Sequence, residues 1–351
     1  MSATITGDKD FRRSPLPPRS TPEGSSPIRI ALLNSMSDGA IVRTEHQFRN
    51  LLKLAAGGRA VEVICCSLPG IPRAGKVRDH IESFYKPIEE LWDHTPDAIV
   101  LTGTEPRARD LRDEPYWASL TELIDRIEEL ALPAMFSCLA AHAAVLHTDG
   151  VARLPLNDKC FGVFEQEVAS DHPLVNGIGS RMWLPHTRWN QVDETELVKA
   201  GYEILSWSAN AGVGFFAKER KGLWLFCQGH PEYDGPNLLR EYRRDVSRFL
   251  AKERATYPEL PRSYFQESDT RLLNAFKQRA LARGDLGVMD GFPRIEQGAA
   301  TWGAWQPAAI KVFRNWLESV VLKNASADDA RLETRSVLAA ADMHDWISDS
   351  P

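Results

Sequence analysis

The sequence predicts an α/β fold, with a mostly parallel sheet flanked by helices, added β-hairpins and C-terminal helices. Two observations support this prediction. In the first half of the chain, short apolar runs with β-branched residues alternate with segments that repeat apolar residues at helical spacing, which is typical of a parallel sheet covered on both faces. In the second half, apolar runs follow one another closely, as the strands of hairpins do.

Four strands are predicted in the first half, with helices between them. The strands are short apolar runs that end at turn residues, and they cover residues 28–34, 61–68, 98–103 and 134–137. A capping-box pattern at residues 44–47 predicts the start of a helix, and Gly57-Gly58 predicts its end. Apolar stripes predict two further helices over residues 117–132 and 139–147.

The second half predicts closely spaced strands and then helices. The strands cover residues 160–164, 181–184, 202–206, 213–216 and 222–227. Two helices are expected over residues 236–251 and 306–321, joined by a stretch with proline and glycine and little regularity. Residues 1–27, rich in Pro, Ser and charge, are expected to form a disordered tail. Residues 323–351 are expected to form a flexible acidic tail with at most a loose helix around residues 332–341, which leaves residues 28–322 as the folded body.

Composition and charge argue against nucleic-acid and membrane partners. The 351 residues carry a net charge of −6 without a basic stripe, which argues against nucleic-acid partners. No signal peptide is seen, and no apolar run reaches the roughly 20 residues that span a membrane, so no membrane partner is expected. The 5 cysteines include no CxxC pair, which suits a reducing compartment. We therefore expect a soluble cytoplasmic protein. No metal site is expected, because no group of His and Cys residues has the spacing of metal ligands.

The run Gln228-Gly229-His230-Pro231-Glu232-Tyr233-Asp234 carries the strongest chemical signal. It follows the predicted strand 222–227 and precedes a helix that Pro236 can start. A His and a Glu two residues apart at such a turn can lie side by side, so that Glu232 holds one ring nitrogen while the other faces a nucleophile. His230 and Glu232 are therefore candidate catalytic residues.

Cys138 is the candidate nucleophile. It lies between the predicted strand 134–137 and the helix that follows, where chemistry gathers in parallel sheets and where a nucleophile elbow would lie. A helix N-terminus favours the thiolate, and the same turn offers backbone N–H groups for an oxyanion hole. The alternative is a packed core cysteine, the commoner role of this residue type. That reading is preferred for the cysteines inside apolar runs, namely Cys65, Cys66, Cys160 and Cys227.

Several stretches, taken in order, resemble a known family. Ser137-Cys138-Leu139-Ala140 with the later His230-Pro231-Glu232 resembles the layout of class I glutamine amidotransferase-like folds. More specifically, the chain resembles the homoserine O-acyltransferases, the succinyl- and acetyltransferases of methionine biosynthesis. The supporting stretches are Asn34-Ser-Met36, Thr44-Glu-His-Gln-Phe48, Ser83-Phe84-Tyr85, Thr102-Gly103, Tyr116-Trp117, Lys159-Cys-Phe-Gly-Val-Phe-Glu165, Pro185-His-Thr-Arg188, Gly229-His-Pro-Glu-Tyr-Asp234, Glu241-Tyr-Arg-Arg-Asp245 and Phe313-Arg-Asn-Trp-Leu317.

The resemblance implies a ping-pong acyl transfer by an acyltransferase domain at residues 28–322. It implies that the Cys138 thiolate takes the acyl group from acyl-CoA, and that His230, oriented by Glu232, takes the proton of the acceptor hydroxyl. It also implies that a small-molecule acceptor is bound, that acyl-CoA is a co-substrate with no resident cofactor, and that the protein is a homodimer. The substrate-binding residues it implies are Lys159, Thr187, Arg188, Glu241 and Arg244. On spacing alone, Glu241 and Arg244 would instead read as a surface ion pair contributing about 0.3–0.5 kcal/mol.

Two departures from the family pattern bear on specificity. The family usually carries Cys-Trp-x-x-Gln, whereas this chain has Cys138-Leu-Ala-Ala-His142. At the position that resembles the family's acyl selector, this chain has Arg107, whose guanidinium could pair with the distal carboxylate of a succinyl group or could block the pocket. We favour succinyl-CoA, since burying a lone cation against an acetyl methyl group is costly. An acetyl-CoA donor and a serine-like acceptor are the alternatives.

Two other functions compete with acyl transfer. One is a glutamine amidotransferase-like hydrolase, which the absence of glycines around Cys138 disfavours, because such enzymes resemble Gly-x-Cys-x-Gly at the nucleophile. The other is a catalytically silent binding protein, which the loss of the family's Trp and Gln beside the nucleophile permits. The joint presence of five residues argues against it, namely Cys138, His230, Glu232, Glu241 and Arg244.

Overall fold

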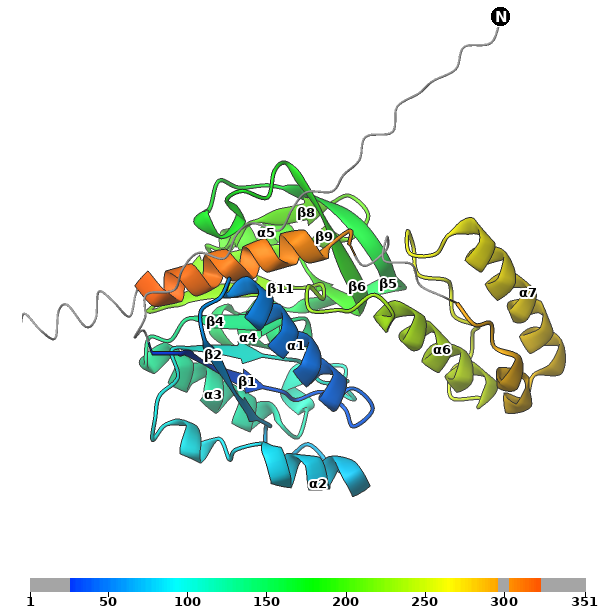
Figure 1. Cartoon of the computed structure of the whole chain (residues 1–351), viewed down its shortest axis with the longest axis horizontal. Coiled ribbons are helices and arrows are strands. Elements are labelled where there is room, and N and C mark those ends of the chain that lie inside the picture. Colours follow the sequence, from blue (N-terminus) through cyan, green and yellow to red (C-terminus); the bar gives the residue numbers. More distant parts are fainter. Residues whose placement is uncertain (1–25, 296–302, 323–351) are drawn as a thin grey trace, which may run out of the picture.

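A seven-stranded, mainly parallel sheet forms the centre of the molecule (Figure 1). The computed structural model describes residues 26–295 and 303–322. The first five strands in the sheet order are mutually parallel, the sixth runs antiparallel to them, and the seventh pairs antiparallel with the sixth and so has the direction of the first five. In that order they are β2 (Val61–Cys66), β1 (Ile28–Leu33), β3 (Ala98–Leu101), β4 (Ala134–Ser137), β11 (Leu223–Cys227), β10 (Phe215–Glu219) and β7 (Glu203–Ile204).

Helices cover both faces of this sheet because its central strands are apolar on both sides, as expected for buried parallel strands. On one face, the core joins the sheet to α1 (Ile41–Ala55) and to the helix at residues 306–322. On the other face, it joins the sheet to α3 (Trp117–Glu129) and α4 (Leu139–Asp149). The α/β fold class expected from the sequence is confirmed.

A second, antiparallel sheet of four strands extends from the carboxyl edge of the first. Its order is β6 (Arg181–Val192), β5 (Arg153–Val168), β8 (Ser206–Ser208) and β9 (Gly212–Val213). β5 and β6 form one long hairpin, where shorter strands were expected, and its register shifts between Pro155 and Cys160. The expected strand 202–206 is split, because β7 belongs to the first sheet and β8 to the second.

A third core forms beside this hairpin. It packs α6 (Asn237–Leu250) and α7 (Glu267–Arg283) against Phe161 and Val163 of β5. α7 lies in the stretch where no regular element was expected. The remaining elements are α2 (Gly75–Phe84), α5 (Glu194–Lys199) and the short 3₁₀ helices η1 (Glu89–Leu91), η2 (Leu111–Asp113), η3 (Pro173–Val175) and η4 (Leu286–Gly291).

Some sequence expectations differ from the structure or fall outside it. The capping box at residues 44–47 is wrong: α1 begins at Ile41, and no side chain caps it. The two expected tails lie outside the described residues, apart from residues 26 and 27. Among the described helices, none combines the length and the apolar character needed to cross a membrane.

Candidate active site

Cys138 occupies a strained turn between β4 and α4. Its backbone has φ 50° and ψ −108°, a conformation that residues with a Cβ seldom adopt. The turn is held because the Cys138 N–H donates to the Cys227 carbonyl at the end of the neighbouring strand β11, at 2.7 Å. The side chain is half-buried at the carboxyl edge of the sheet. This geometry is that of the nucleophile elbow expected from the sequence.

His230 reaches the same edge from β11. β11 pairs in parallel with β4, and Cys227 lies opposite Ser137, so both strands deliver their following residues to one place. Gly229 lets the turn pass close to β6, since a Cβ there would lie 2.6 Å from Leu184 Cγ and 2.7 Å from the Pro185 oxygen. The His230 N–H then donates to that same carbonyl at 2.8 Å and fixes the turn.

Glu232 orients the imidazole of His230. Its Oε1 lies 2.8 Å from His230 Nδ1, and both side chains are buried. The Tyr233 ring stacks on the imidazole with centroids 4.3 Å apart. Glu232 Oε2 is buried and has no hydrogen-bond partner among the described residues. Because Glu232 holds Nδ1, the second ring nitrogen, Nε2, is available to exchange a proton with a reacting group.

Cys138 and His230 are in contact. Burial would lower the pKa of His230, but the Glu232 carboxylate and the Cys138 side chain, both hydrogen-bonded to the ring, raise that pKa well above its ordinary value. The raised pKa favours the imidazolium form of His230, which lies in hydrogen-bond contact with the Cys138 sulfur.

In the other four cysteines burial dominates the pKa, even at Cys65, whose sulfur accepts from Arg49 Nη2 at 3.2 Å. Burial raises the pKa of Cys65 and of Cys66 to about 12, and it raises the pKa of Cys227 well above its ordinary value. Cys160 is half-buried, and its pKa is also raised by burial. All four thiols are therefore held in the unreactive protonated form at neutral pH.

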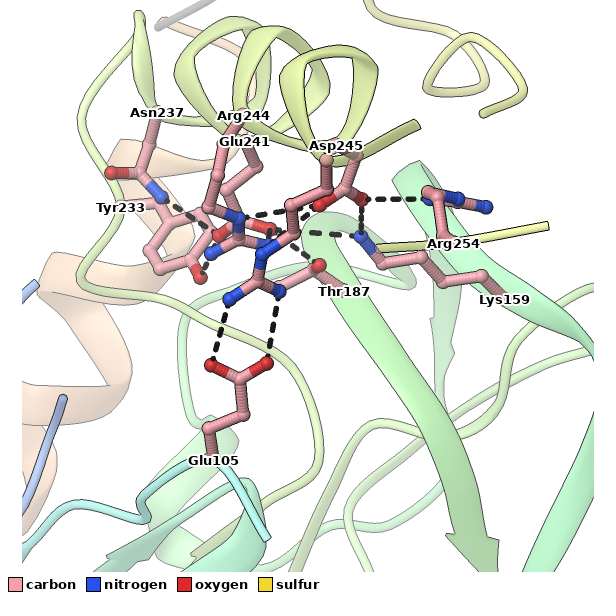
Figure 2. A network of polar contacts seen from close by, with 10 residues as sticks. Glu105, Lys159, Thr187, Tyr233, Asn237, Glu241, Arg244, Asp245 and Arg254 are labelled. Atoms are coloured by element: carbon pink, nitrogen blue, oxygen red, sulfur yellow. Dashed lines mark hydrogen bonds and ion pairs between the residues drawn. The ribbon is translucent and has the colours of Figure 1, made fainter. Parts of the chain in front are cut away.

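A polar network from β5, β6 and α6 lies beside the site, and Figure 2 shows it around Glu241. Glu241 Oε2 accepts from the Thr187 hydroxyl at 2.6 Å. Its Oε1 accepts from the Tyr233 hydroxyl at 2.6 Å and from Asn237 Nδ2 at 3.3 Å. Because Tyr233 also stacks on His230, this network is joined to the imidazole.

Asp245 forms ion pairs with three cationic side chains. Lys159 Nζ lies 2.8 Å from Asp245 Oδ2, Arg244 Nη2 lies 3.1 Å from Oδ1, and Arg254 Nη1 lies 3.5 Å from Oδ2. Burial would raise the pKa of Asp245, but Lys159 and then Arg244 outweigh it, so the pKa stays below its ordinary value. Arg244 is 3.9 Å from Glu241, so its nearer partner is Asp245, and 47% of its side chain stays exposed.

Arg188 and Arg107 occupy different settings. Arg188 is buried and donates to His186 and to the carbonyls of Asn190 and Ala211, while its charge interacts with Cys138. Its guanidinium is thus largely engaged by the protein. Arg107 is exposed, and its backbone N–H donates to Glu114 Oε1 at 2.5 Å.

His142 lies one helical turn after Cys138 and is buried. Its Nε2 is 3.0 Å from Gln228 Oε1, which also accepts from the Val192 N–H at 2.9 Å. His142 must therefore donate this hydrogen bond and is neutral, consistent with a pKa that burial lowers to about 3. The side chain ties the nucleophile helix to the residue two positions before His230.

Sequence reasoning did not single out Asp245, Tyr233 or the ion pair of Glu105 with Arg248, which is bidentate at 2.9 and 3.2 Å. A signal existed for Asp245, which lies four residues after Glu241 and so on the same helix face. No group of three potential metal ligands occurs among the residues that the structure describes.

A cavity of about 470 Å³ opens between the His230–Asp234 turn and α1. Glu232 and Tyr233 line it from the turn, whereas Arg43 and His46 line it from α1. Cys138 is not part of its wall, so this cavity lies behind the histidine–glutamate pair and not at the sulfur.

Fold and site together define a class: an α/β protein whose elbow cysteine contacts a histidine–glutamate pair at the carboxyl edge of a parallel sheet. A family model described as homoserine O-succinyltransferase matches residues 17–327. The chain belongs to this family, and the resemblance seen in its motifs is confirmed.

Known proteins of that name are similar over most of the chain. Homoserine O-succinyltransferase of Methylorubrum extorquens is 42% identical over 84% of this chain and 87% of its own length. The enzyme of that name from Rhodopseudomonas palustris is 41% identical over 84% of this chain and 88% of its own length. Among solved structures, a glutamine amidotransferase from Methylobacillus flagellatus aligns with a TM-score of 0.48 and 13% identity over 84% of this chain and 94% of that chain.

Proposed function

We propose that this protein transfers the succinyl group of succinyl-CoA to the hydroxyl of homoserine through an acyl-cysteine intermediate, in the cytoplasm and as a step of methionine biosynthesis. The observation that carries the proposal is the contact between Cys138 and His230, with Glu232 on the far nitrogen, in a chain of this family. Acyl-CoA is a co-substrate here, and no resident cofactor is required.

The first half-reaction acylates the cysteine. The Cys138 thiolate attacks the thioester carbonyl, and a new carbon–sulfur bond forms as the bond to the CoA sulfur breaks. His230 gives its proton to the departing CoA thiolate, which leaves the imidazole neutral. The N–H groups of Leu139 and Ala140 lie at the start of α4 and have no partner within the helix, so they are the donors that we assign to the tetrahedral oxyanion.

In the second half-reaction His230 accepts a proton, whereas it donated one in the first. The hydroxyl of homoserine attacks the acyl-cysteine carbonyl, and the now neutral His230 takes its proton while the Cys138 sulfur leaves as the thiolate. The Glu232 carboxylate stabilises the imidazolium that forms, because it lies 2.8 Å from Nδ1 in a buried setting. The pair of charges present at the start is thereby restored.

The polar network around Glu241 contains both cationic and anionic side chains. Recognition of a zwitterionic amino acid such as homoserine requires both. The half-exposed Arg244 can hold the carboxylate of homoserine, since a guanidinium matches it with two donors. The Glu241 and Asp245 carboxylates provide the acceptors for its ammonium group. Thr187 of β6 donates to Glu241 and Lys159 of β5 donates to Asp245, so these two side chains would hold the acids in position.

Release of free CoA tests the proposal. The purified protein is assayed with succinyl-CoA and acetyl-CoA as donors and with homoserine and serine as acceptors. CoA release that is fastest with succinyl-CoA and homoserine is expected. Glutamate release from glutamine without acyl transfer would show a hydrolase instead, and release of neither product would support the silent protein.

A further inference from the structure

The segment after β3 passes directly beside the nucleophile. Gly103 lies so close to the start of α4 that a Cβ there would be 2.4 Å from Leu139 Cβ, and Leu139 is the residue after Cys138. Residues 104–110, which follow Gly103, are all half-buried or exposed. The segment therefore begins beside the turn that carries the sulfur.

Two charged side chains hold this segment: the buried Glu114 carboxylate and the half-buried Arg153 guanidinium. The Glu114 carboxylate accepts from the N–H groups of Arg107 and Ala108 at 2.5 and 2.6 Å. From the other side, Arg153 Nη2 donates to the carbonyls of Ala108 and Arg109 at 3.1 and 2.9 Å. Only one of the two terminal nitrogens of Arg153 is used to hold the segment.

The other nitrogen has no partner. Arg153 Nη1 is buried and makes no hydrogen bond to any residue that the structure describes, and the same is true of the Tyr116 hydroxyl. Tyr116 is 5% exposed. Two buried polar groups of this kind are unusual, because a buried donor without an acceptor is costly. Arg153 also interacts electrostatically with Tyr116 and with Cys138, so all three lie in one neighbourhood.

We propose that Arg153 Nη1 and the Tyr116 hydroxyl bind the distal carboxylate of the acyl group carried by Cys138. A carboxylate supplies acceptors for both donors at once, and the cation balances its charge. In this proposal the segment held by Glu114 and Arg153 borders the bound acyl chain. This inference rests on the proposed function and assigns donor selection to Arg153 and Tyr116, while the Arg107 side chain stays exposed outside.

The test compares two donors that differ in one group. Succinyl-CoA and butyryl-CoA carry four-carbon acyl chains, and only the first ends in a carboxylate. The variants are Tyr116→Phe and Arg153→Lys, and kcat/KM is measured for both donors with homoserine. The controls are Tyr257→Phe in the α6–α7 core and Arg112→Lys, whose side chain is exposed and paired with Asp110.

We expect Tyr116→Phe to lower kcat/KM for succinyl-CoA by roughly tenfold or more, as for loss of a hydrogen bond to a charged group, and to leave butyryl-CoA unchanged. Arg153→Lys should reduce the preference in the same direction, because Lys keeps the charge but loses the paired geometry. The controls should keep the ratio of the wild type. Thermal unfolding is measured as well, since Tyr116→Phe removes a hydroxyl without a partner and should not lower Tm.

Unchanged preference in both variants would overturn this inference, as would loss of the preference in Arg107→Gly alone. Equal losses with both donors would assign Tyr116 and Arg153 a structural role only and would also overturn it. In either case the wild type would still transfer succinyl groups, so the proposed function would survive. A wild type that releases no CoA from either donor would instead refute the proposed function itself.

Discussion

Replacing Glu232 by Gln tests the role of the histidine–glutamate pair in isolation. The change keeps the shape of the side chain and an oxygen that can accept from His230 Nδ1, but it removes the negative charge 2.8 Å from the ring. It also replaces the partnerless buried Oε2 of a carboxylate by part of a neutral amide. The substitution therefore separates catalysis from folding.

The expected loss follows from the hydrogen bond. A hydrogen bond to a charged group contributes about 1.5–3 kcal/mol, and about 1.4 kcal/mol corresponds to a tenfold change in rate. If that contribution is lost from the transition state, kcat/KM falls roughly 10- to 150-fold. Stability should fall little, because burying a charged oxygen without a partner is itself unfavourable.

The sign of the pH effect can also be predicted. In the native protein the pKa of His230 is raised chiefly by Glu232 against the opposing effect of burial. Without the carboxylate charge, burial dominates and the pKa falls. Because acylation needs the imidazolium as proton donor, the alkaline limb of the acylation rate should move to lower pH in Glu232→Gln. Stopped-flow release of CoA against pH measures this. An alkaline limb at the same pH in both proteins would refute the reasoning.

Substitutions at three further positions probe the turn residues and the acceptor site. Cys138→Gly and Cys138→Ala should both abolish turnover. The Gly variant should be more stable than the Ala variant by about 1–3 kcal/mol in chemical denaturation, because φ is 50° at this position. Equal stabilities of the two variants would contradict the assigned backbone strain. Gly229→Ala should cost about 1–3 kcal/mol and lower kcat, because its Cβ meets the Pro185 oxygen at 2.7 Å; the matched control, Gly291→Ala, has nothing within 4 Å and should be neutral. Arg244→Ala should raise KM for homoserine at least tenfold while CoA release in the acylation half-reaction is unchanged; an unchanged KM would remove Arg244 from the acceptor site.

The positions of Cys138 and His230 could be predicted because each lies one to three residues beyond an apolar strand. In a parallel sheet such positions share an edge. The elements that sequence reasoning missed lack a clear signal. α2 buries no residue, and α7 buries only Leu273, Phe276 and Ala280 while Leu272 and Leu281 are exposed, which blurs its apolar stripe.

Interactions between distant segments could not be predicted either. Arg153 meets the carbonyls of Ala108 and Arg109 across more than 40 positions of sequence, and its second nitrogen is seen to lack a partner only when the packing is known. The sequence places Asp245 on the same helix face as Glu241, but two of its three cationic partners come from β5 and from the segment after α6. Such contacts depend on tertiary packing and not on local pattern.

The central claim is that the sulfur of Cys138 carries the acyl group between donor and acceptor. The protein is mixed with succinyl-CoA in the absence of homoserine, quenched in acid and digested, and the peptide that contains Cys138 is weighed by mass spectrometry. We expect this peptide to gain one succinyl group, which disappears when homoserine is added before the quench. CoA release with homoserine but no modification of Cys138 at any time would contradict the account.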